Sequence, residues 1–315
     1  MYQNLLITGG CGFIGSNFIN YYFYKNTTTN IYNIDALYYC ASKDNILEEI
    51  RNSSRYHFIE GKIQSRDLIK YILNEYHIDA IINFAAQTHV QNSFDGPSQF
   101  VYDNIVGTHN LLLECKIYGK IKKFIHVSTD EVYGESQLHE NSQKTESSIL
   151  CPTNPYAASK ASAELLVRSY YYSYNFPIII TRSNNIYGPN QYPEKLIPLF
   201  IKQLKKSLPV TIQGDGSNLR SFVHAYDISK AFELILNKGT IGETYNIGGS
   251  HEYSVMDIAK ILISLIKNTE DFEKWIEYIP NRPYNDKRYF INDNKIKQLG
   301  WNQQISLLDG IKQLI

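Results

Sequence analysis

Short apolar runs alternate with amphipathic stretches along the first half of the chain. The apolar runs have the length and β-branched content of buried strands and lie at 4–8, 31–34, 56–60, 79–84, 124–127 and 178–181. Helical periodicity separates them at about 13–25, 67–76, 98–118 and 156–174. Strands that alternate with helices indicate an α/β fold with a parallel, doubly wound sheet of the Rossmann type.

The pattern changes in the second half of the chain. Strands become shorter and prolines cluster at 189, 193, 198 and 209. We therefore expect a main domain formed by residues 1–182 and 221–247, and a smaller, C-terminal substrate-binding lobe formed by residues 183–220 and 248–315. Polar residues fill the stretch 135–150, which we expect to be an exposed loop.

A glycine-rich turn follows the first predicted strand. The glycines are spaced as Gly9-x-x-Gly12-x-x-Gly15 and lead directly into a helical pattern. Gly9 permits a tight turn, Gly12 lets a pyrophosphate approach the backbone, and Gly15 lets the helix pack close to the strand. The free N–H groups of the helix N-terminus favour phosphate. A plain strand–turn–helix connection is the alternative interpretation.

The second predicted strand supports the dinucleotide interpretation. It ends in Asp35, which lies 20 residues after Gly15. A carboxylate at this position accepts hydrogen bonds from the hydroxyls of the adenosine ribose and repels a 2′-phosphate. We therefore predict NAD, and not NADP, as the cofactor. The fourth strand opens into Ala85 and Ala86, whose small side chains let a flat cofactor lie against the backbone.

A cluster of polar side chains ends the fifth predicted strand. Ser128, Thr129, Asp130 and Glu131 follow a buried apolar run at once, and two carboxylates are costly to bury there. The carboxyl ends of strands are where open α/β sheets bind their ligands. We therefore predict that Thr129, Asp130 and Glu131 form the reactive edge of an active site. A polar strand end that leads into a solvated loop is the alternative.

Tyr156 and Lys160 lie four residues apart, on one face of a predicted helix. A tyrosine has a pKa of about 10, and a nearby ammonium stabilises the phenolate and lowers that pKa. The pair is therefore a candidate base for removing a proton from a sugar or alcohol hydroxyl. A solvated pair on a helix surface is the alternative.

Basic residues recur in the smaller lobe, where they could grip a pyrophosphate. Arginine suits bidentate contacts with phosphate. The candidates are Lys195, Arg220, Arg282 and Arg288, and for Arg282 an ordinary surface charge is the more natural interpretation.

Composition and charge exclude several classes of protein. The chain contains 31 Lys+Arg and 31 Asp+Glu residues, so it lacks the broad basic field of a nucleic-acid binder. No apolar run approaches the roughly 20 residues of a membrane span. The four cysteines form no C-x-x-C pair, so we expect neither a metal site nor a disulfide framework. Without a signal-type leader before Leu5, a cytoplasmic location is expected.

Taken together, these motifs resemble the extended short-chain dehydrogenase/reductase family. Within it, the chain is similar to nucleoside-diphosphate-glucose 4,6-dehydratases, both the dTDP-glucose type and the UDP-glucose domain of plant rhamnose synthases. The resemblance covers essentially the whole chain. It rests on TGGCGFIG (8–15), NFAAQTHV (83–90), STDEVYG (128–134), the Tyr156/Lys160 pair, RSNNIYGPNQYPEKLIP (182–198), GDGSNLRSFVH (214–224) and NRPYNDKRYF (281–290).

The resemblance implies roles for particular residues. Tyr156 and Lys160 would serve oxidation at sugar C4, with Thr129 touching the 4-hydroxyl; Asp130 would be the general acid and Glu131 the general base of water elimination. The implied cofactor contacts are Phe13, Ile14, Asp35, Ile63, Ala85, Ala86, Tyr156, Lys160 and Asn185, in addition to the glycine turn. The implied nucleotide-sugar contacts are Thr88, Thr129, Asn184, Lys195, Leu196, Arg220, Arg288 and Tyr289.

Several positions depart from the pattern of the family. Lys62 replaces an Asp near the adenine, Ala36 follows the ribose acid where a basic or hydroxyl residue is common, and Gln213 replaces a Tyr on the nucleobase side. Asp103 and His251 also differ from the residues common there, Thr and Asn. None of these positions belongs to the proposed chemistry, and together they leave the choice between dTDP-glucose and UDP-glucose open.

The implied enzyme is an NAD-dependent hydro-lyase of nucleotide-sugar metabolism that forms a 4-keto-6-deoxy sugar, as in deoxysugar or rhamnose synthesis. A sugar-nucleotide 4-epimerase would share NAD and the Tyr156/Lys160 pair but needs no acid–base pair for elimination. A UDP-glucuronate decarboxylase and a non-catalytic NAD-sensing protein are further alternatives. The helical patterns at 98–118 and 155–174 suggest a homodimer through a four-helix bundle.

Overall fold

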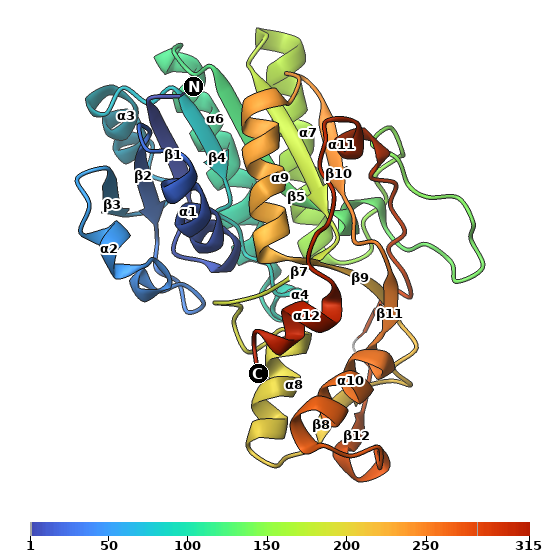
Figure 1. Cartoon of the computed structure of the whole chain (residues 1–315). Coiled ribbons are helices and arrows are strands. Elements are labelled where there is room, and N and C mark those ends of the chain that lie inside the picture. The colour runs from blue at the N-terminus through green and yellow to red at the C-terminus, as the bar shows by residue number, and fades with distance from the viewer. Residues whose placement is uncertain (1, 282) are drawn as a thin grey trace.

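The main sheet has seven parallel strands and is shown in Figure 1. The computed structural model describes residues 2–281 and 283–315. The strand order is β10-β6-β5-β4-β1-β2-β3, and every neighbouring pair is parallel. The strands are β1 (Asn4–Thr8), β2 (Asn30–Asp35), β3 (Tyr56–Glu60), β4 (Ala80–Asn83), β5 (Lys123–Thr129), β6 (Ile178–Ser183) and β10 (Thr244–Ile247). The predicted doubly wound α/β sheet is confirmed.

Helices cover both faces of this sheet. In β1, Leu5 and Ile7 point into one apolar core, whereas Leu6 between them points into the other. This alternation is the period of two that a strand buried on both faces requires. One face is covered by α1 (Phe13–Lys25) and α9 (Ala225–Lys238), and the other by α3 (Arg66–Glu75), α6 (Gly107–Tyr118) and α7 (Pro155–Tyr174).

The helical stretch predicted at 98–118 contains a change of helix type. It starts as α5 (Pro97–Phe100), continues as a π-helical turn (Val101–Val106) and ends as α6. Asp103 and Asn104 are buried inside the turn, where Asn104 donates a hydrogen bond to Ser159 of α7. Side-chain periodicity predicts a helix here, but it does not reveal the wider turn, which is typical of functional sites.

The smaller lobe lies below the main sheet in the view of Figure 1. Its core contains Phe200, Ile212 and Leu262. It is built from α8 (Leu196–Lys205), β8 (Val210–Gln213), α10 (Val255–Lys267) and β12 (Ile276–Ile279). A three-stranded sheet, with strands β7 (Asn185–Tyr187), β9 (Leu219–His224) and β11 (Glu252–Ser254), accompanies it. The remaining helices are α2 (Glu48–Arg51), α4 (Val90–Asp95), α11 (Asn294–Gln298) and α12 (Leu307–Lys312).

All seven parallel strands end at the same edge of the sheet. Asp35, Thr129 and Ser183 are the last residues of β2, β5 and β6, and the glycine turn follows β1. This common direction brings side chains from distant parts of the sequence to one region between the sheet and the smaller lobe. In the part of the chain that the structure describes, no helix is both long and apolar enough to span a bilayer.

Candidate active site

Two of the three spaced glycines of the motif, Gly9 and Gly15, have no room for a side chain. Gly9 has φ of +68°, and a Cβ on it would lie 2.8 Å from Cα of Ala85. A Cβ on Gly15 would lie 2.5 Å from the carbonyl oxygen of Gly9. The turn therefore brings the start of α1 against both β1 and the end of β4, which is the close approach that the sequence motif predicts.

Asp35 lies beside this turn and is held by backbone N–H groups. Its Oδ2 accepts a hydrogen bond from Cys11 at 2.9 Å, and its Oδ1 accepts one from Leu37 at 2.8 Å. Burial raises the pKa of Asp35, and the hydrogen bonds from the backbone act in the opposite direction. The carboxylate is thus fixed at the end of β2, where the hydroxyls of a ribose could reach it.

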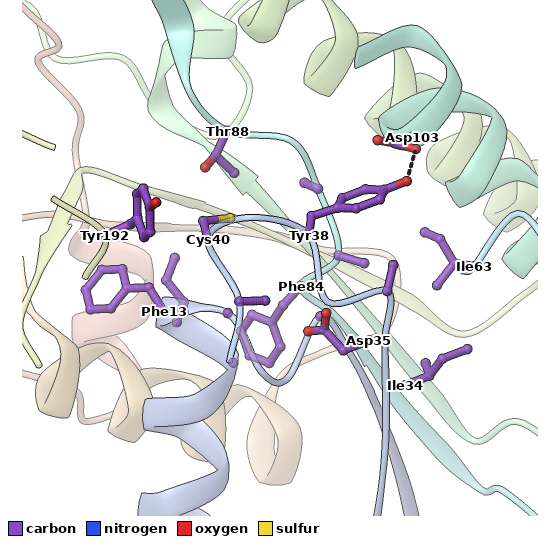
Figure 2. Close-up of a pocket in the computed structure, with 18 of the residues that line it drawn as sticks. Phe13, Ile34, Asp35, Tyr38, Cys40, Ile63, Phe84, Thr88, Asp103 and Tyr192 are labelled. Carbon is purple, nitrogen blue, oxygen red and sulfur yellow. Dashed lines mark hydrogen bonds between the residues drawn. The ribbon is translucent and has the colours of Figure 1, made fainter. Parts of the chain in front are cut away.

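Figure 2 shows the pocket around this turn. Side chains from the start of α1, the segment after β2 and the end of β4 converge on it, among them Phe13, Tyr38 and Phe84. Nine of the predicted cofactor contacts line the pocket: Gly9, Gly12, Phe13, Ile14, Gly15, Asp35, Ile63, Ala85 and Ala86. A glycine-lined helix start beside a fixed carboxylate and a flat apolar wall fits NAD, so the donor set and the shape agree with the predicted cofactor.

Some of the predicted cofactor and nucleotide-sugar contacts line a different pocket from the one expected. Thr88 and Lys195, which were predicted to contact the sugar nucleotide, line the cofactor pocket, and Lys195 also lines a second pocket. Asn185, which was predicted to contact the cofactor, lines the second pocket instead. Nζ of Lys195 donates to the carbonyl of Thr88 at 2.7 Å, so these two residues stand where the two pockets meet.

The unusual residues Ala36, Lys62 and Asp103 all line the cofactor pocket. The Lys62 ammonium lies 5.4 Å from the centre of the Tyr38 ring, and the Tyr38 hydroxyl donates to Asp103 at 3.3 Å, as Figure 2 shows. Asp103 also accepts hydrogen bonds from three glutamine side chains: Gln64, Gln87 and Gln99. At the predicted adenine end, this chain therefore has a stacked, hydrogen-bonded wall of its own.

Asp130 is a buried carboxyl group at the end of β5. It is 2% exposed, and its two oxygens accept hydrogen bonds from the Asn184 amide at 2.6 Å and from the Thr129 hydroxyl at 3.2 Å. Burial, followed by the negative charge of Glu131, raises the pKa of Asp130 to about 7. The group therefore holds a proton near neutral pH, as a general acid must.

Glu131 faces a more polar and more positive environment. Its Oε2 accepts a hydrogen bond from the Asn154 amide at 3.1 Å and lies 3.4 Å from the hydroxyl oxygen of Tyr289. Burial raises its pKa too, but Asn154 and the positive charges of Arg220 and Lys195 oppose this shift. The adjacent carboxyl groups thus have different surroundings, which is the condition for one to act as acid while the other acts as base.

Tyr156 and Lys160 lie on one face of α7 and are both buried, as predicted. Lys160 donates to the carbonyl of Val127 in β5 at 2.6 Å, and burial lowers its pKa to about 8. The predicted lowering of the Tyr156 pKa is wrong for the protein alone. Burial and the charge of Glu131 raise it, whereas a hydrogen bond with Thr129 lowers it.

The second pocket lies between the polar end of β5 and the smaller lobe. It includes Glu131 and five residues of the predicted contact sets: Asn185, Lys195, Leu196, Arg220 and Tyr289. Gln213 also lines it. Asp130 adjoins Glu131 in the chain, and Thr129 and Asn184 hydrogen-bond to Asp130. Tyr156 and Lys160 are not among the lining residues of either pocket, although Glu131 lies close enough to Tyr156 to affect its pKa.

Arg288 lies outside both linings. It pairs with Glu252 at 2.5 Å and donates to the carbonyl of Glu140 at 2.8 Å, while its guanidinium stacks on Phe290. Arg220, in contrast, lies over the Tyr289 ring, 4.6 Å from its centre. Of the predicted basic residues, Lys195 and Arg220 therefore line the same pocket, Arg288 does not, and Arg282 lies outside the described residues.

Sequence reasoning missed two polar residues of the second pocket. Asn154 caps α7 by accepting from the backbone of Ala157 at 2.9 Å, and its amide nitrogen donates to Glu131. An Asn directly before a Pro at the start of a helix is the signal that could have found the cap. Asp286 is 3% exposed and reaches Glu131 through Tyr289. It lies in the motif NRPYNDKRYF, but no spacing or periodicity within that motif indicates a connection to Glu131.

Known proteins resemble this chain over nearly its whole length. The model of the GDP-mannose 4,6 dehydratase family matches residues 6–314. A trifunctional Arabidopsis thaliana enzyme, whose first named activity is UDP-glucose 4,6-dehydratase, is 47% identical over 99% of this chain and 46% of its own length. The Homo sapiens dTDP-D-glucose 4,6-dehydratase is 45% identical over 99% of this chain and 89% of its own.

A solved structure gives the same result. The dTDP-glucose 4,6-dehydratase DesIV of Streptomyces venezuelae, with NAD and TYD bound, is 37% identical, has a TM-score of 0.92, and covers 98% of this chain and 95% of its own. The chain spans about half the length of the trifunctional plant relatives that it matches. The fold, the glycine turn, the polar end of β5 and these similarities agree: the chain belongs to the GDP-mannose 4,6-dehydratase family of extended short-chain dehydrogenases/reductases.

Proposed function

We propose that this chain is an NAD-dependent nucleoside-diphosphate-glucose 4,6-dehydratase. The observation that carries the proposal is the pair Asp130 and Glu131, which lies at the carboxyl end of β5 beside a pocket suited to NAD. The curated relatives named above support the same activity. The substrate would be dTDP-glucose or UDP-glucose, and the products its 4-keto-6-deoxy derivative and water.

The cofactor would lie across the carboxyl edge of the sheet. We propose that the glycine turn and the N-terminus of α1 hold its pyrophosphate and that Asp35 holds the adenosine ribose. Bound NAD would supply an oxidised nicotinamide that accepts hydride from sugar C4 and later returns it to C6. Ala85 and Ala86 would form the wall beside it, with Tyr156, Lys160 and Asn185 toward the reactive end.

Tyr156 would receive the proton of the sugar 4-hydroxyl as C4 is oxidised. Thr129 lies within hydrogen-bonding reach of Tyr156 and would orient the 4-hydroxyl. Because the buried Tyr156 holds its proton tightly, the phenolate needs nearby positive charge. We propose that Lys160 would supply part of it, and its hydrogen bond to the carbonyl of Val127 holds the ammonium beside β5. Its pKa of about 8 leaves Lys160 mostly charged at neutral pH.

Asp130 and Glu131 would then remove water. The 4-ketone acidifies the proton on C5, and Glu131 takes that proton. The electron pair of the broken C5–H bond then forms the double bond between C5 and C6. Asp130 gives its proton to O6, which leaves as water. The step needs one protonated and one ionised carboxyl group, and the raised pKa of Asp130 and the positive surroundings of Glu131 favour this distribution.

The second pocket would hold the nucleotide sugar. The proposed contacts that line it are Lys195, Leu196, Arg220 and Tyr289, with Thr88 at its border with the cofactor pocket. Asn184 would act beside Asp130. Arg288 stays a proposed contact only if it leaves Glu252 when substrate binds. The division into an NAD-binding domain and a nucleotide-sugar-binding lobe also stays a proposal; its boundary at residue 221 falls inside β9.

The nearest rival is a sugar-nucleotide 4-epimerase, which would use the same cofactor pocket and Tyr156. An epimerase transfers hydride at C4 alone, so it needs no acid for O6 and no base for C5. Asp130, which is buried, and Glu131, which is partly buried, would then have no role in the reaction, although burying carboxyl groups is costly. This comparison favours the dehydratase.

The proposal is tested by supplying dTDP-glucose and UDP-glucose separately to the purified chain. A dehydratase produces a 4-keto sugar from one or both, which is measured by its absorbance in alkali. The ratio of kcat/KM for the two substrates decides the nucleobase preference. If neither substrate gives the keto sugar, and a 4-epimer forms in its place, the epimerase is correct.

The assembly and the location are proposals as well. Helices α6 and α7 and the π-helical turn expose large apolar side chains, including Tyr102, Ile117, Leu165 and Tyr172. Such a surface suits a homodimer through a four-helix bundle. Light scattering at micromolar concentration should give twice the mass of the chain, and a monomer would contradict the proposal. A cytoplasmic location is proposed from the spacing of the cysteines.

A further inference from the structure

Asp286 is a buried carboxylate that the proposed reaction leaves without a role. It lines the second pocket and is 3% exposed. Its Oδ1 accepts a hydrogen bond from the Thr153 hydroxyl at 2.7 Å, and its Oδ2 accepts one from the Tyr289 hydroxyl at 2.5 Å. A buried carboxylate is costly unless its partners compensate, so its place beside the catalytic base calls for a physical explanation.

The Tyr289 hydroxyl stands between two carboxylates. Its oxygen lies 2.5 Å from Oδ2 of Asp286 and 3.4 Å from Oε2 of Glu131. A phenol has one proton to donate. The shorter contact places that proton on the side of Asp286, so the hydroxyl presents a lone pair to Glu131. That arrangement becomes a good hydrogen bond only when Glu131 itself carries a proton.

We propose that Asp286 is a positioning residue that acts through Tyr289 to hold Glu131 ready to accept and keep the C5 proton. The proposal rests on the proposed dehydratase function. As the C5–H bond breaks, the electron pair stays with the sugar and the proton moves to Oε2 of Glu131. The new O–H group then donates to the oxygen of Tyr289, whose own proton stays directed at Asp286.

The other groups around Glu131 act in the opposite direction. The Asn154 amide donates to the same Oε2 at 3.1 Å and stabilises the carboxylate. Arg220 and Lys195 do so by charge, whereas Asp286 favours the protonated form. Asp130 and Tyr156 also interact with Glu131. Without Asp286, Tyr289 could turn its proton toward Glu131, and every hydrogen-bonding neighbour named here would then weaken the base.

The arrangement predicts a defect at one step of the reaction. In Asp286→Asn and in Tyr289→Phe, removal of the C5 proton should become slower, and kcat should fall about 10²-fold, in the range of contributions from acid–base groups. The primary deuterium isotope effect on kcat with C5-deuterated substrate should rise above that of the wild type. The acid limb of the kcat/KM profile should move to lower pH in Asp286→Asn because the pKa of Glu131 falls.

The experiment compares these two variants, their double variant and the wild type, using whichever nucleotide sugar the wild type accepts. The control is Asp271→Asn, which removes a carboxylate from a surface ion pair with Lys274 and should keep wild-type kcat. Because Asp286 acts through Tyr289, the double variant should lose no more than the worse single variant, whereas independent roles would multiply. Thermal melting identifies the variants that fold; if Asp286→Asn does not, Tyr289→Phe decides.

Three results would overturn the inference. The first is a kcat within about twofold of the Asp271→Asn control in both variants. The second is a loss of kcat without a larger isotope effect, because that indicates a purely structural role for Asp286. The third is a wild type that forms no 4-keto product from either nucleotide sugar. This last result removes the proposed function itself, and it is recognised without any variant.

Discussion

The cofactor pocket and the acid–base site are built in different ways. The cofactor pocket depends on the backbone: Gly9 and Gly15 permit close approach, and N–H groups hold Asp35. Its central residues lie in two short stretches, the glycine turn and the strand that ends in Asp35, and both are recognisable from the sequence pattern alone. The acid–base site depends on side chains from distant segments, since Asp130 needs Asn184 and Glu131 needs partners from both the start of α7 and the loop after β12.

This difference separates what the fold supplies from what the chemistry needs. A strand, a glycine turn and a ribose acid bind a dinucleotide in many proteins with different activities. The loss of water requires in addition a carboxyl group that is protonated at neutral pH. Burial and the charge of Glu131 raise the pKa of Asp130 to about 7, so a large share of this group is protonated at neutral pH. The acid–base site also depends on Asn184, which lies in the segment predicted to belong to the smaller lobe.

The largest expected loss of activity comes from replacing the acid–base residues Asp130 and Glu131 while leaving the cofactor pocket intact. Asp130→Asn and Glu131→Gln should each lower kcat for the 4-keto product about 10³-fold, because each removes one proton transfer of the elimination. NAD content and the circular dichroism spectrum should stay those of the wild type, since neither residue lines the cofactor pocket. Wild-type turnover in both variants would end the assignment of the pair.

A substitution in the cofactor pocket should affect NAD binding first. In Gly9→Ala, the new Cβ meets the backbone of Ala85, and the strain should cost about 1–3 kcal/mol and lower NAD affinity up to about 10²-fold. Calorimetric titration and melting temperature measure the two effects. Gly300→Ala is the matched control, since Gly300 also has positive φ but no heavy atom within 4 Å of its Cβ position. Equal NAD affinity in the two variants would contradict the close-approach argument.

The raised pKa of Asp130 predicts that kcat falls on the alkaline side of the pH profile. Because the pKa of Asp130 is about 7 and its acid form is needed, kcat should fall about tenfold per pH unit well above that value. The folded pKa is raised above that of the unfolded chain. The stability that Asp130 contributes is therefore fully present below its ordinary pKa and is lost as the pH rises through about 7.

Melting temperature checks this second consequence. Between pH 5 and pH 8, the wild type should lose stability relative to Asp130→Asn, by on the order of a few kcal/mol, because the variant has no carboxyl group to ionise. A constant difference in melting temperature over that range would show that Asp130 has an ordinary pKa.

The smallest effect should come from Asn154, which caps α7 and hydrogen-bonds to Glu131. Asn154→Ser keeps a side-chain oxygen for the helix cap but removes the amide that donates to Glu131, so it should change kcat only about threefold and leave stability nearly unchanged. Asn154→Ala should in addition cost about 1 kcal/mol of unfolding free energy through the lost cap. Chemical denaturation and steady-state kinetics separate the two roles, and an equal loss of stability in both variants would contradict them.

Local sequence patterns predict much of the candidate site. The glycine turn, Asp35 and the strand end at Thr129 follow from periodicity and spacing, and the structure places them at one edge of the sheet. Other features depend on contacts between distant segments. Asp286 lies 155 residues from Glu131, so only the folded chain shows their connection through Tyr289. The pairing of Arg288 with Glu252 is equally invisible to local pattern.

Burial explains why the predicted direction of the Tyr156 pKa shift differs from the one in the structure. The spacing of Tyr156 and Lys160 predicts a shared helix face, and that prediction holds, but the direction of the Tyr156 pKa depends on how much water the fold removes around it. The π-helical turn at 101–106 is similar, because the apolar positions of a helix do not fix where an extra residue is inserted. Its buried Asn104 connects the end of β4 to α7 through Gln87 and Ser159.

The most direct test of the account is the mass of the product that the wild-type chain forms from dTDP-glucose or UDP-glucose with NAD. The account predicts a product lighter than its substrate by one water, absent from the reaction of Glu131→Gln. A product of unchanged mass would mean that the chain only oxidises and re-reduces C4. That result would contradict the assignment of Asp130 and Glu131 to the loss of water.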